Sequence, residues 1–363
     1  MEIIDNFFAE FVDIAWGWQT AVLLLGAGVY FSLRTKLKPF RYLGYAFEVL
    51  IGKHPSKDEV GEVSHFRALT ASLSGTIGLG NIAGVAVAIQ LGGPGAIFWM
   101  WVTAVFGIAT KFFTATLSVL YRETGHDGKP NAGTMYIIKN GLPKYMLPLA
   151  YFFAFAGVIA GLPAFQANQV VQLTNDLYFP EVEYFKYYAG AFLVIVTAMV
   201  VLGGLKRIAN VSAWLVPFMG GLYLSAVLFA VLINYDQFLP AIGLIVSEAF
   251  SINSAVAGGL VGVILTGIKR GAFSNEAGIG TEALIHGTAK TTNPVKQGLI
   301  AMTGPIFDTL IMCTLTAVII LISGVWQTSD SSGVTLTSEA FLSTLGPLGP
   351  IILFAVSYTH LTL

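Results

Sequence analysis

Charge and cysteine are scarce in this sequence. Only 11% of its 363 residues are charged and 55% are hydrophobic, whereas a soluble globular chain carries about 25% charged residues. So few charges could not cover the surface of a large soluble core, which excludes that class of protein. The one cysteine, Cys313, lies in an apolar run, so a disulfide framework and a Cys/His metal cluster are both excluded.

The motifs of enzymes, nucleic-acid binders and channels are also missing. The sequence has no paired acids, nucleophile–base pair or metal cluster at a spacing suited to catalysis, so we expect no enzyme. The net charge is −1 and no Lys/Arg cluster indicates nucleic acid. No strand–helix unit surrounds the glycine runs, so they are not nucleotide-binding fingerprints. No filter or pore motif suggests a channel, and no obligate protein partner is evident.

What the sequence does contain is a series of apolar runs, with a mean hydropathy of +0.74. Runs of about 20 apolar residues cross a bilayer, so we predict an all-α, multi-pass integral membrane protein. A piece at 239–250 is expected to be re-entrant or interfacial. The first run lacks a small-residue cleavage site and is expected to be a retained helix. The predicted spans are 14–33, 68–91, 94–121, 147–173, 187–204, 212–234, 255–287 and 297–323, with a ninth starting near Gly349.

The connections between these spans differ in charge. Alternate connections at 34–67, 122–146, 205–211 and 288–296 hold 15 of the 19 Lys and Arg residues. The other set carries Lys186 as its one basic residue and is rich in Asp and Glu. Because cytoplasmic loops carry an excess of Lys and Arg, we predict that the first set is cytoplasmic. The N-terminus then lies outside the plasma or inner membrane.

Two of the spans are interrupted by glycine and polar residues. The first contains SGTIGLGNIAG at 74–84, and the second contains KRGAFSNEAGIG at 269–280. They occupy corresponding positions, with four spans between them, and cross the membrane in opposite senses. Interrupted helices of this kind are typical of inverted-repeat secondary transporters.

The first interruption supports two interpretations. Glycines there would let a ligand approach the backbone, and a broken helix offers free N–H groups to a carboxylate and free carbonyls to a cation. Alternatively, Gly75, Gly78, Gly80 and Gly84 merely allow close packing of helices. The neighbouring Asn81 favours the first interpretation, and Thr76 does the same, because unpaired polar side chains are expensive at this depth.

The second interruption brings charge into the membrane. Glu276 is a functional candidate by default, but pairing with Lys269 or Arg270 is the favoured alternative. Phe273 could wall off a small apolar side chain, and the hydroxyl of Ser274 could coordinate a cation.

Further polar residues lie in other spans. Gln166 and Asn168 could bind substrate or simply join helices. Asp308 could counter a cation or pair within the protein, and His286 is expected to be solvated at a cytoplasmic helix end.

Five segments resemble the alanine or glycine:cation symporter family, the sodium:alanine symporters. They are GGPGAIFWMWVTAVFG at 92–107, ATKFF at 109–113, TIGLGNIAGVA at 76–86, KRGAFSNEAGIG at 269–280 and MTGPIFDT at 302–309. The resemblance runs in order from about residue 16 to about residue 324. It implies a LeuT-like bundle of five plus five helices, preceded by the helix at 14–33, that takes up small neutral amino acids with sodium by alternating access. LeuT itself is the best-known example of that architecture and belongs to a different family.

The same resemblance implies roles for individual residues. The amides at 78–80 would receive the substrate carboxylate, and Phe273 would line the side-chain pocket. The backbone oxygen of Thr76 and two side chains would form one sodium site, and two carbonyls would contribute to a second. The implied substrate residues are Gly78, Leu79, Gly80, Gln166, Phe273 and Asn275, and the implied sodium residues are Ser74, Thr76, Ile77, Asn81 and Ser274.

The end of the chain departs from the family pattern. Members continue for several helices past Gly349, whereas this chain ends ILFAVSYTHLTL. We interpret residues 1–356 as the transporter domain, truncated at its C-terminus, and 357–363 as an unmatched tail that could be an artefact.

Several hypotheses stay open from the sequence. The leading one is sodium-coupled symport of alanine or glycine. Alternatives are a proton-coupled transporter of the same superfamily, in which Glu276 or Asp308 titrates, a passive facilitator, and a non-functional fragment. The sequence does not decide between alanine, glycine and serine.

Overall fold

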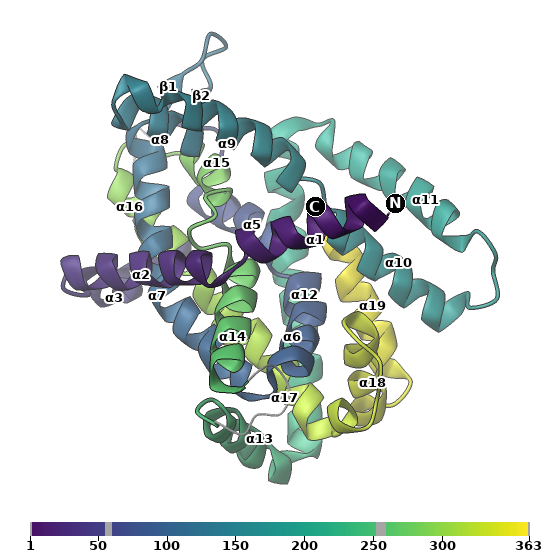
Figure 1. Cartoon of the computed structure of the whole chain (residues 1–363). Helices are drawn as coiled ribbons and strands as arrows, with labels where there is room; N and C mark the ends of the chain where they lie inside the picture. The colour runs from purple at the N-terminus through teal and green to yellow at the C-terminus, as the bar shows by residue number, and fades with distance from the viewer. Residues whose placement is uncertain (1, 55–59, 252–258, 362–363) are drawn as a thin grey trace.

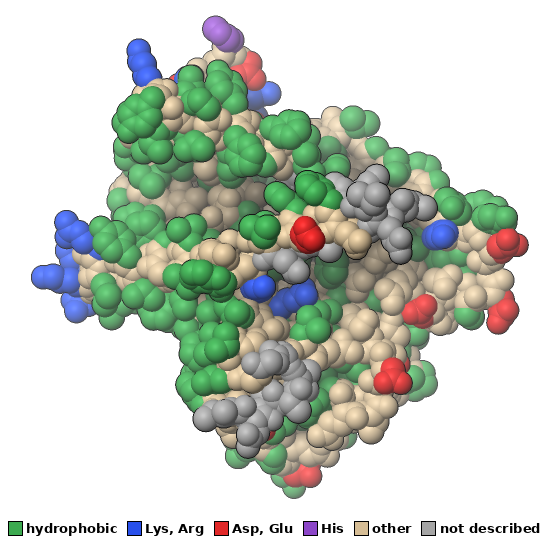
Figure 2. All heavy atoms as spheres, viewed as in Figure 1, with side chains coloured by type: hydrophobic (Ala, Val, Ile, Leu, Met, Phe, Trp, Pro, Cys, Tyr) green, Lys and Arg blue, Asp and Glu red, His purple; other side chains and the backbone are tan. Residues whose placement is uncertain are grey.

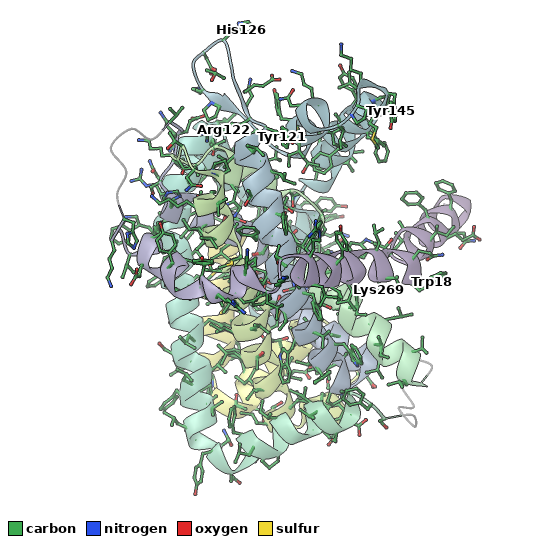
Figure 3. All side chains as sticks on the ribbon, turned by 90° about the vertical axis from the view of Figure 1, so that its left-hand side faces the viewer. Trp18, Tyr121, Arg122, His126, Tyr145 and Lys269 are labelled. Carbon is green, nitrogen blue, oxygen red and sulfur yellow. The ribbon has the colours of Figure 1, made fainter. Side chains whose placement is uncertain are left out.

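The computed structural model describes residues 2–54, 60–251 and 259–361. Nearly all secondary structure in them is helical, as predicted, apart from one small hairpin. Its strands, β1 (Glu123–Thr124) and β2 (Pro130–Asn131), pair antiparallel. They follow the long helix α7 and carry His126 at the turn (Figure 3).

The helices divide into a long upright bundle and shorter peripheral pieces (Figure 1). A π-helical segment, η2, interrupts the run between α16 and α17, and η1 and η3 are single 3₁₀ turns. The bounds are α1 Glu2–Ala15, α2 Trp18–Arg34, α3 Lys38–Arg41, α4 Leu43–Leu50, α5 His65–Thr76, α6 Leu79–Gly92, α7 Gly95–Leu120, α8 Thr134–Gly141, η1 Lys144–Met146, α9 Leu147–Ala160, α10 Ala164–Tyr178, α11 Phe185–Val201, α12 Gly204–Ile233, α13 Tyr235–Glu248, α14 Gly259–Asn275, α15 Glu282–Gly287, α16 Pro294–Ala301, η2 Ile306–Cys313, α17 Thr314–Ser323, η3 Val325–Gln327, α18 Val334–Leu345 and α19 Leu348–Leu361.

Four helical stretches in the described residues are long and apolar enough to cross a membrane: Gly95–Leu120, Lys144–Tyr178, Gly204–Ile233 and Pro294–Ser323. A fifth is the pair α5 and α6, which bend by 41° at their break. Three other predicted spans are helical but reach only 17 residues each, in α2, α11 and α14. That is about 25 Å of helix, close to the lower limit for a 30 Å hydrocarbon layer. The start of the predicted span 255–287 lies outside the described residues.

The N-terminal helices differ in direction from the bundle. Figures 1 and 3 both show α1 and α2 lying across the upright helices. The prediction of a helix at 14–33 is confirmed for α2, although Gly17 separates it from α1. That this helix crosses the bilayer stays a prediction.

The remaining segments refine the sequence interpretation. The piece at 239–250 is part of a single helix, α13, that packs on α7 and α17. The predicted ninth span corresponds to helix α19, which begins at Leu348, one residue before the predicted start, and continues to Leu361. Helix α18 lies in a stretch that the sequence pattern assigns to a connection.

Small residues bring α14 against α7. A Cβ atom added to Gly267 would collide with the carbonyl oxygen of Ala96, and one added to Gly271 would lie 3.0 Å from Cβ of Thr103. A side chain is excluded at Gly267 and would be tight at Gly271, so the absence of side chains lets the helix axes approach closely. This contact holds α14, which carries the second interruption, against α7.

Large apolar side chains cover much of the molecular surface (Figure 2). Many of them are more than half exposed, including Phe152, Phe155, Val194 and Leu232. A soluble monomer rarely exposes contiguous apolar surface on this scale. The distribution fits a protein whose outer face contacts lipid.

Arg122 fastens the loops at one end of the bundle (Figure 3). Its Nη1 donates to the backbone oxygens of Gly287 and Ala289 at 2.9 and 2.8 Å. Its Nη2 donates to those of Val60 and Thr291 at 2.8 and 2.6 Å. Burial lowers the pKa of Arg122, but its ordinary pKa of about 12 or more keeps it charged at neutral pH. The segment before α5 is thereby tied to the loop between α15 and α16.

We expect Arg122→Lys to destabilise the protein by about 2–4 kcal/mol. The single ammonium group of a lysine cannot donate to all four carbonyls that the guanidinium group of Arg122 reaches. Thermal unfolding of the purified protein in detergent measures this. Lys139→Gln is the control, since it breaks an exposed ion pair with Glu123 and should change the melting temperature little. Equal melting temperatures for the two variants would contradict the role given to Arg122.

Candidate functional site

The first interrupted helix breaks at two residues, Ile77 and Gly78. Helix α5 ends at Thr76 and α6 begins at Leu79. Among the described hydrogen bonds, none uses the amides of Leu79 or Gly80 as donors or the carbonyls of residues 74–77 as acceptors. The break therefore leaves N–H groups and carbonyl oxygens available, as its glycine content predicted.

Three of the four glycines around this break do not serve helix packing. A Cβ atom added to Gly75, Gly80 or Gly84 would have no neighbouring atom within 4 Å. Gly84 is buried nevertheless, so the face of α6 that carries it borders unfilled space. The close-packing alternative is wrong at these three positions, in contrast to Gly267 on α14.

Asn81 connects the break to the bundle interior. Its Oδ1 accepts the N–H of Gly78 at 3.0 Å, and its Nδ2 donates to Oδ1 of Asp308 at 2.7 Å. The same Nδ2 lies 3.0 Å from the backbone oxygen of Asp308. Of the three amides predicted to bind a carboxylate, that of Gly78 is thus already engaged by Asn81.

The second interruption follows Asn275, where α14 ends. Glu276 has a φ of 53°, and Gly278 and Gly280 have φ of 93° and 89°. Such left-handed residues stop a helix, and glycine adopts them without penalty. Oδ1 of Asn275 accepts the N–H of Ala277 at 2.9 Å, which stabilises the exit from α14. This bond holds Ser274 and Asn275 in the last turn of α14.

The π-helical segment η2 contributes the acid at the centre of the site. Bonds in a π-helix run from residue i to i+5, and such segments are frequent at functional sites. Asp308 and Cys313 are five residues apart, and both lie beside Ser274. Oγ of Ser274 donates to Oδ2 of Asp308 at 2.7 Å and lies 3.2 Å from Sγ of Cys313. Thr309 also donates its hydroxyl to Oδ2 of Asp308, at 2.7 Å.

These contacts define one buried polar cluster, which joins α6, α14 and η2. Each member is at most 1% exposed. The Asp308 carboxylate accepts bonds from three side chains, yet within the described ranges no Lys or Arg forms an ion pair with it. Lys111, buried on α7, lies beyond ion-pair distance. A buried carboxylate without a cation in direct contact is a costly feature of a membrane protein. The polar cluster consists of Asn81, Ser274, Asn275, Asp308, Thr309 and Cys313.

The predicted substrate residues outside this cluster lie nearby in the fold. Phe273 is 36% exposed and meets Phe165 edge to face, with ring centroids 5.9 Å apart, and Trp16 at 6.4 Å. These rings form an aromatic wall beside α14. Gln166 follows Phe165 on α10 and is half-buried, whereas Asn168 is exposed. The buried amide of this helix is Gln169, which accepts the N–H of Val334 at 3.2 Å.

The charges near the second interruption do not pair as favoured from the sequence. Oε2 of Glu276 accepts the hydroxyl of Thr281 at 2.5 Å. In the described parts of the chain, no ion pair joins Glu276 to Lys269 or Arg270. Both bases lie on α14 ahead of its end, and Figure 3 shows Lys269 beside α2. The left-handed conformation of Glu276 turns the chain away from the helix that carries them.

Ser74, another of the implied sodium residues, uses its side chain within the protein. Oγ of Ser74 donates to the carbonyl of Ala71 at 2.7 Å and accepts the hydroxyl of Ser212 at 3.3 Å. Its backbone carbonyl, the atom implied for a second cation, has no donor among the described bonds. The same is true of the carbonyls of Thr76 and Ile77.

Sequence reasoning missed several buried polar residues. Thr309 follows Asp308 directly and Cys313 lies in an apolar run, and neither stands out because a π-helix has no clear sequence signature.

The expectation that His286 is solvated is wrong. It is fully buried, and its Nδ1 lies 2.6 Å from Nε2 of Gln297, whose Oε1 lies 2.6 Å from Nδ1 of His65.

Comparison with known proteins agrees with the geometry. A family model described as "Sodium:alanine symporter family" matches residues 1–361. The sodium/alanine symporter AgcS of Methanococcus maripaludis is 42% identical, over 94% of this chain and 76% of its own length. Two proteins of Bacillus subtilis are each 36% identical. The probable sodium/glutamine symporter GlnT matches over 95% of this chain and 71% of its length, and the putative sodium/proton-dependent alanine carrier YrbD over 90% and 66%.

Proposed function

The chain belongs to the sodium:alanine symporter family, and we propose that it couples the inward movement of sodium to the uptake of a small neutral amino acid. Its relatives are transporters, so it is a secondary transporter of amino acids in a membrane and not an enzyme. The choice of alanine or glycine as substrate is part of the proposal. So is sodium as the coupling ion.

The buried Asp308 carboxylate carries this proposal. Three side chains donate hydrogen bonds to it, but within the described residues no protein cation lies at ion-pair distance. A cation from solution could take that place. The hydroxyl oxygens of Ser274 and Thr309 beside it are ligands that suit a hard cation. Unwound backbone nearby adds carbonyl oxygens, as in other broken-helix transporters.

We place the substrate between the two interrupted helices. The amides of Leu79 and Gly80 suit the carboxylate, because they lie at the positive end of α6. The unfilled space beside Gly80 and Gly84 leaves room for the ligand. Phe273, in the aromatic wall, would limit the size of the side chain, and Gln166 and Asn275 would supply polar contacts. The carbonyls of Ser74 and Ile77 remain candidates for a second sodium ion, and that of Thr76 for the first.

The fold proposal follows from the same elements. Helices α5–α6 and α14–α15 are each interrupted at their middle and would correspond to the first and sixth helices of a LeuT-like bundle. Helix α2 would precede that bundle as an additional helix. The cytoplasmic side would be the end that carries Arg122, which places the N-terminus outside by the positive-inside rule.

Asn81→Ala should weaken the response to sodium about tenfold, because a buried neutral hydrogen-bonding group contributes about 1–3 kcal/mol. The sodium concentration for half-maximal alanine uptake measures this, with protein abundance in the membrane as a check. If uptake keeps its sodium response at normal abundance, the role given to Asn81 is wrong.

Uptake of radioactive alanine into proteoliposomes tests the proposal as a whole. A sodium gradient at fixed pH should drive accumulation, and a proton gradient without sodium should not. Proton coupling is the second candidate, because Asp308 is acidic and one relative is named sodium/proton-dependent. Accumulation driven by protons alone would favour it, and uptake indifferent to both gradients would indicate a passive facilitator.

A further inference from the structure

A cavity of about 840 Å³ lies where the end of α2 and the short helix α3 approach α7 and the start of α16. Its cationic lining is formed by Arg34, Lys36, Lys38 and Lys296, and no Asp or Glu is among the described residues that line it. Figure 2 shows Lys and Arg side chains gathered at the left-hand end of the molecule, over α2 and α3. A concave surface with charges of one sign concentrates ligands of the opposite sign.

Three of the four bases in this lining have no acidic partner among the described ion pairs. The described ion pairs include none of Arg34, Lys36 and Lys38, and all three residues are exposed. Lys296 is buried, and its Nζ donates to the backbone oxygen of His54 at 2.8 Å. That bond fixes the ammonium group at the inner wall of the cavity.

The backbone holds two of the bases in a defined turn. Lys36 and Leu37 both adopt left-handed conformations, with φ of 52° and 58°. The N–H of Leu37 donates to the carbonyl of Ser32 at 2.9 Å, and that of Lys38 to Thr35 at 3.1 Å. Left-handed non-glycine residues persist only where the surrounding structure enforces them. Lys36 and Lys38 therefore extend from an ordered corner between α2 and α3.

The rest of the lining is largely aromatic. Tyr42, Tyr45, Phe112 and Phe113 contribute to it, and the ring of Phe113 packs on Phe31 with centroids 4.7 Å apart. A free inorganic anion gains nothing from such a wall. An amphiphilic anion gains both charge pairing and apolar contact, and tyrosine suits the boundary between the two.

The depth of the cavity agrees with a lipid headgroup. Phe113 precedes the end of α7 at Leu120 by about 10 Å along the helix axis. Lys296 lies in the first turn of α16, which is at the same end of the bundle as Arg122. The interfacial region of a bilayer occupies several ångströms on each side of the hydrocarbon layer. Basic pockets between helices at this level are suited to acidic lipid headgroups.

We propose that this cavity binds the phosphodiester headgroup of an anionic phospholipid. Arg34, Lys36 and Lys38 contact the phosphate, Lys296 closes the inner side, and the aromatic residues pack against the upper acyl chains. The site lies outside the polar cluster and does not depend on the coupling ion or on the amino acid transported. It anchors the corner between α2 and α3 to one leaflet.

The test is native mass spectrometry of the purified protein with phosphatidylglycerol, phosphatidylcholine or inorganic phosphate. Wild-type protein should retain phosphatidylglycerol in preference to phosphatidylcholine. The triple variant Arg34→Gln/Lys36→Gln/Lys38→Gln should lose affinity for phosphatidylglycerol on the order of 100-fold, because each interfacial base contributes about fivefold. The control Lys144→Gln/Lys206→Gln/Arg207→Gln removes the same charge from positions outside the cavity and should bind as wild type.

Three results would overturn the proposal. Equal losses in both triple variants would mean that diffuse charge attracts the lipid. Equal retention of the two lipids by wild type would mean that the headgroup charge is not recognised. Binding of inorganic phosphate as tight as that of phosphatidylglycerol would identify a free-anion site. Lys36→Arg/Lys38→Arg keeps the charge and should keep the lipid, which separates loss of binding from loss of fold.

Discussion

Asp308→Asn should raise the sodium concentration needed for half-maximal alanine uptake on the order of 100-fold or more. Removing one partner from a buried charge pair costs about 3–5 kcal/mol, and each 1.4 kcal/mol is a factor of ten in affinity. Asparagine has the same shape and still accepts the bond from Asn81 on its oxygen. The variant therefore removes the charge with little change in volume. Uptake measured over a range of sodium concentrations gives the result.

The control for this variant is Tyr223→Phe. Tyr223 is fully buried, and its hydroxyl lies 2.7 Å from Oγ1 of Thr316, which is not a member of the polar cluster. Loss of that bond should lower stability by about 1 kcal/mol and leave the sodium dependence unchanged. If Asp308→Asn transports alanine with the sodium response of Tyr223→Phe, Asp308 does not balance the coupling ion.

Gly80→Ala should fold normally and yet transport poorly. An added Cβ atom has no neighbour within 4 Å in the structure, and alanine favours a helix over glycine by about 0.5–1 kcal/mol. In our account the new methyl group occupies space that the substrate carboxylate needs. Crowding of this kind costs about 1–3 kcal/mol, so the KM for alanine should rise about tenfold.

The matched substitution Gly267→Ala should behave in the opposite way. Its added Cβ atom would collide with both Cβ of Trp99 and the carbonyl oxygen of Ala96. Because part of this clash is with backbone, α14 must move away from α7, and the melting temperature should fall by several degrees. A fall in stability for Gly80→Ala with unchanged KM would show that Gly80 is a packing residue after all.

The sequence predicted the interrupted helices well, because glycine and Asn are expensive within a bilayer and leave a clear pattern. The break between α5 and α6 and the end of α14 within the stretch 269–280 agree with that pattern, whereas the joint site of Asn81 and Ser274 was implied by the family resemblance. The carbonyl oxygens of residues 74–77 have no hydrogen-bond donor among the described bonds, as expected of a broken helix. The patterns of the two breaks could not say which groups meet, since α6, α14 and η2 are far apart in the chain.

Three features were beyond the reach of sequence patterns for physical reasons. The role of Asp308 depends on a π-helical segment that places it beside Ser274, and nothing in IFDTLIMC distinguishes a π-helix from an α-helix. The pairing favoured for Glu276 failed because residue 276 adopts a left-handed conformation that glycine at 278 and 280 continues. The steep angle of α2 to the bundle is likewise a tertiary feature, although the sequence predicts a helix there and its apolar character.

Equilibrium binding of radioactive sodium to the purified protein tests the central claim most directly. We predict saturable binding that alanine tightens, because ligands whose sites are coupled increase each other's affinity equally. Asp308→Asn should abolish this binding, whereas Tyr223→Phe should retain it. Sodium binding that survives in Asp308→Asn at wild-type affinity would contradict the account.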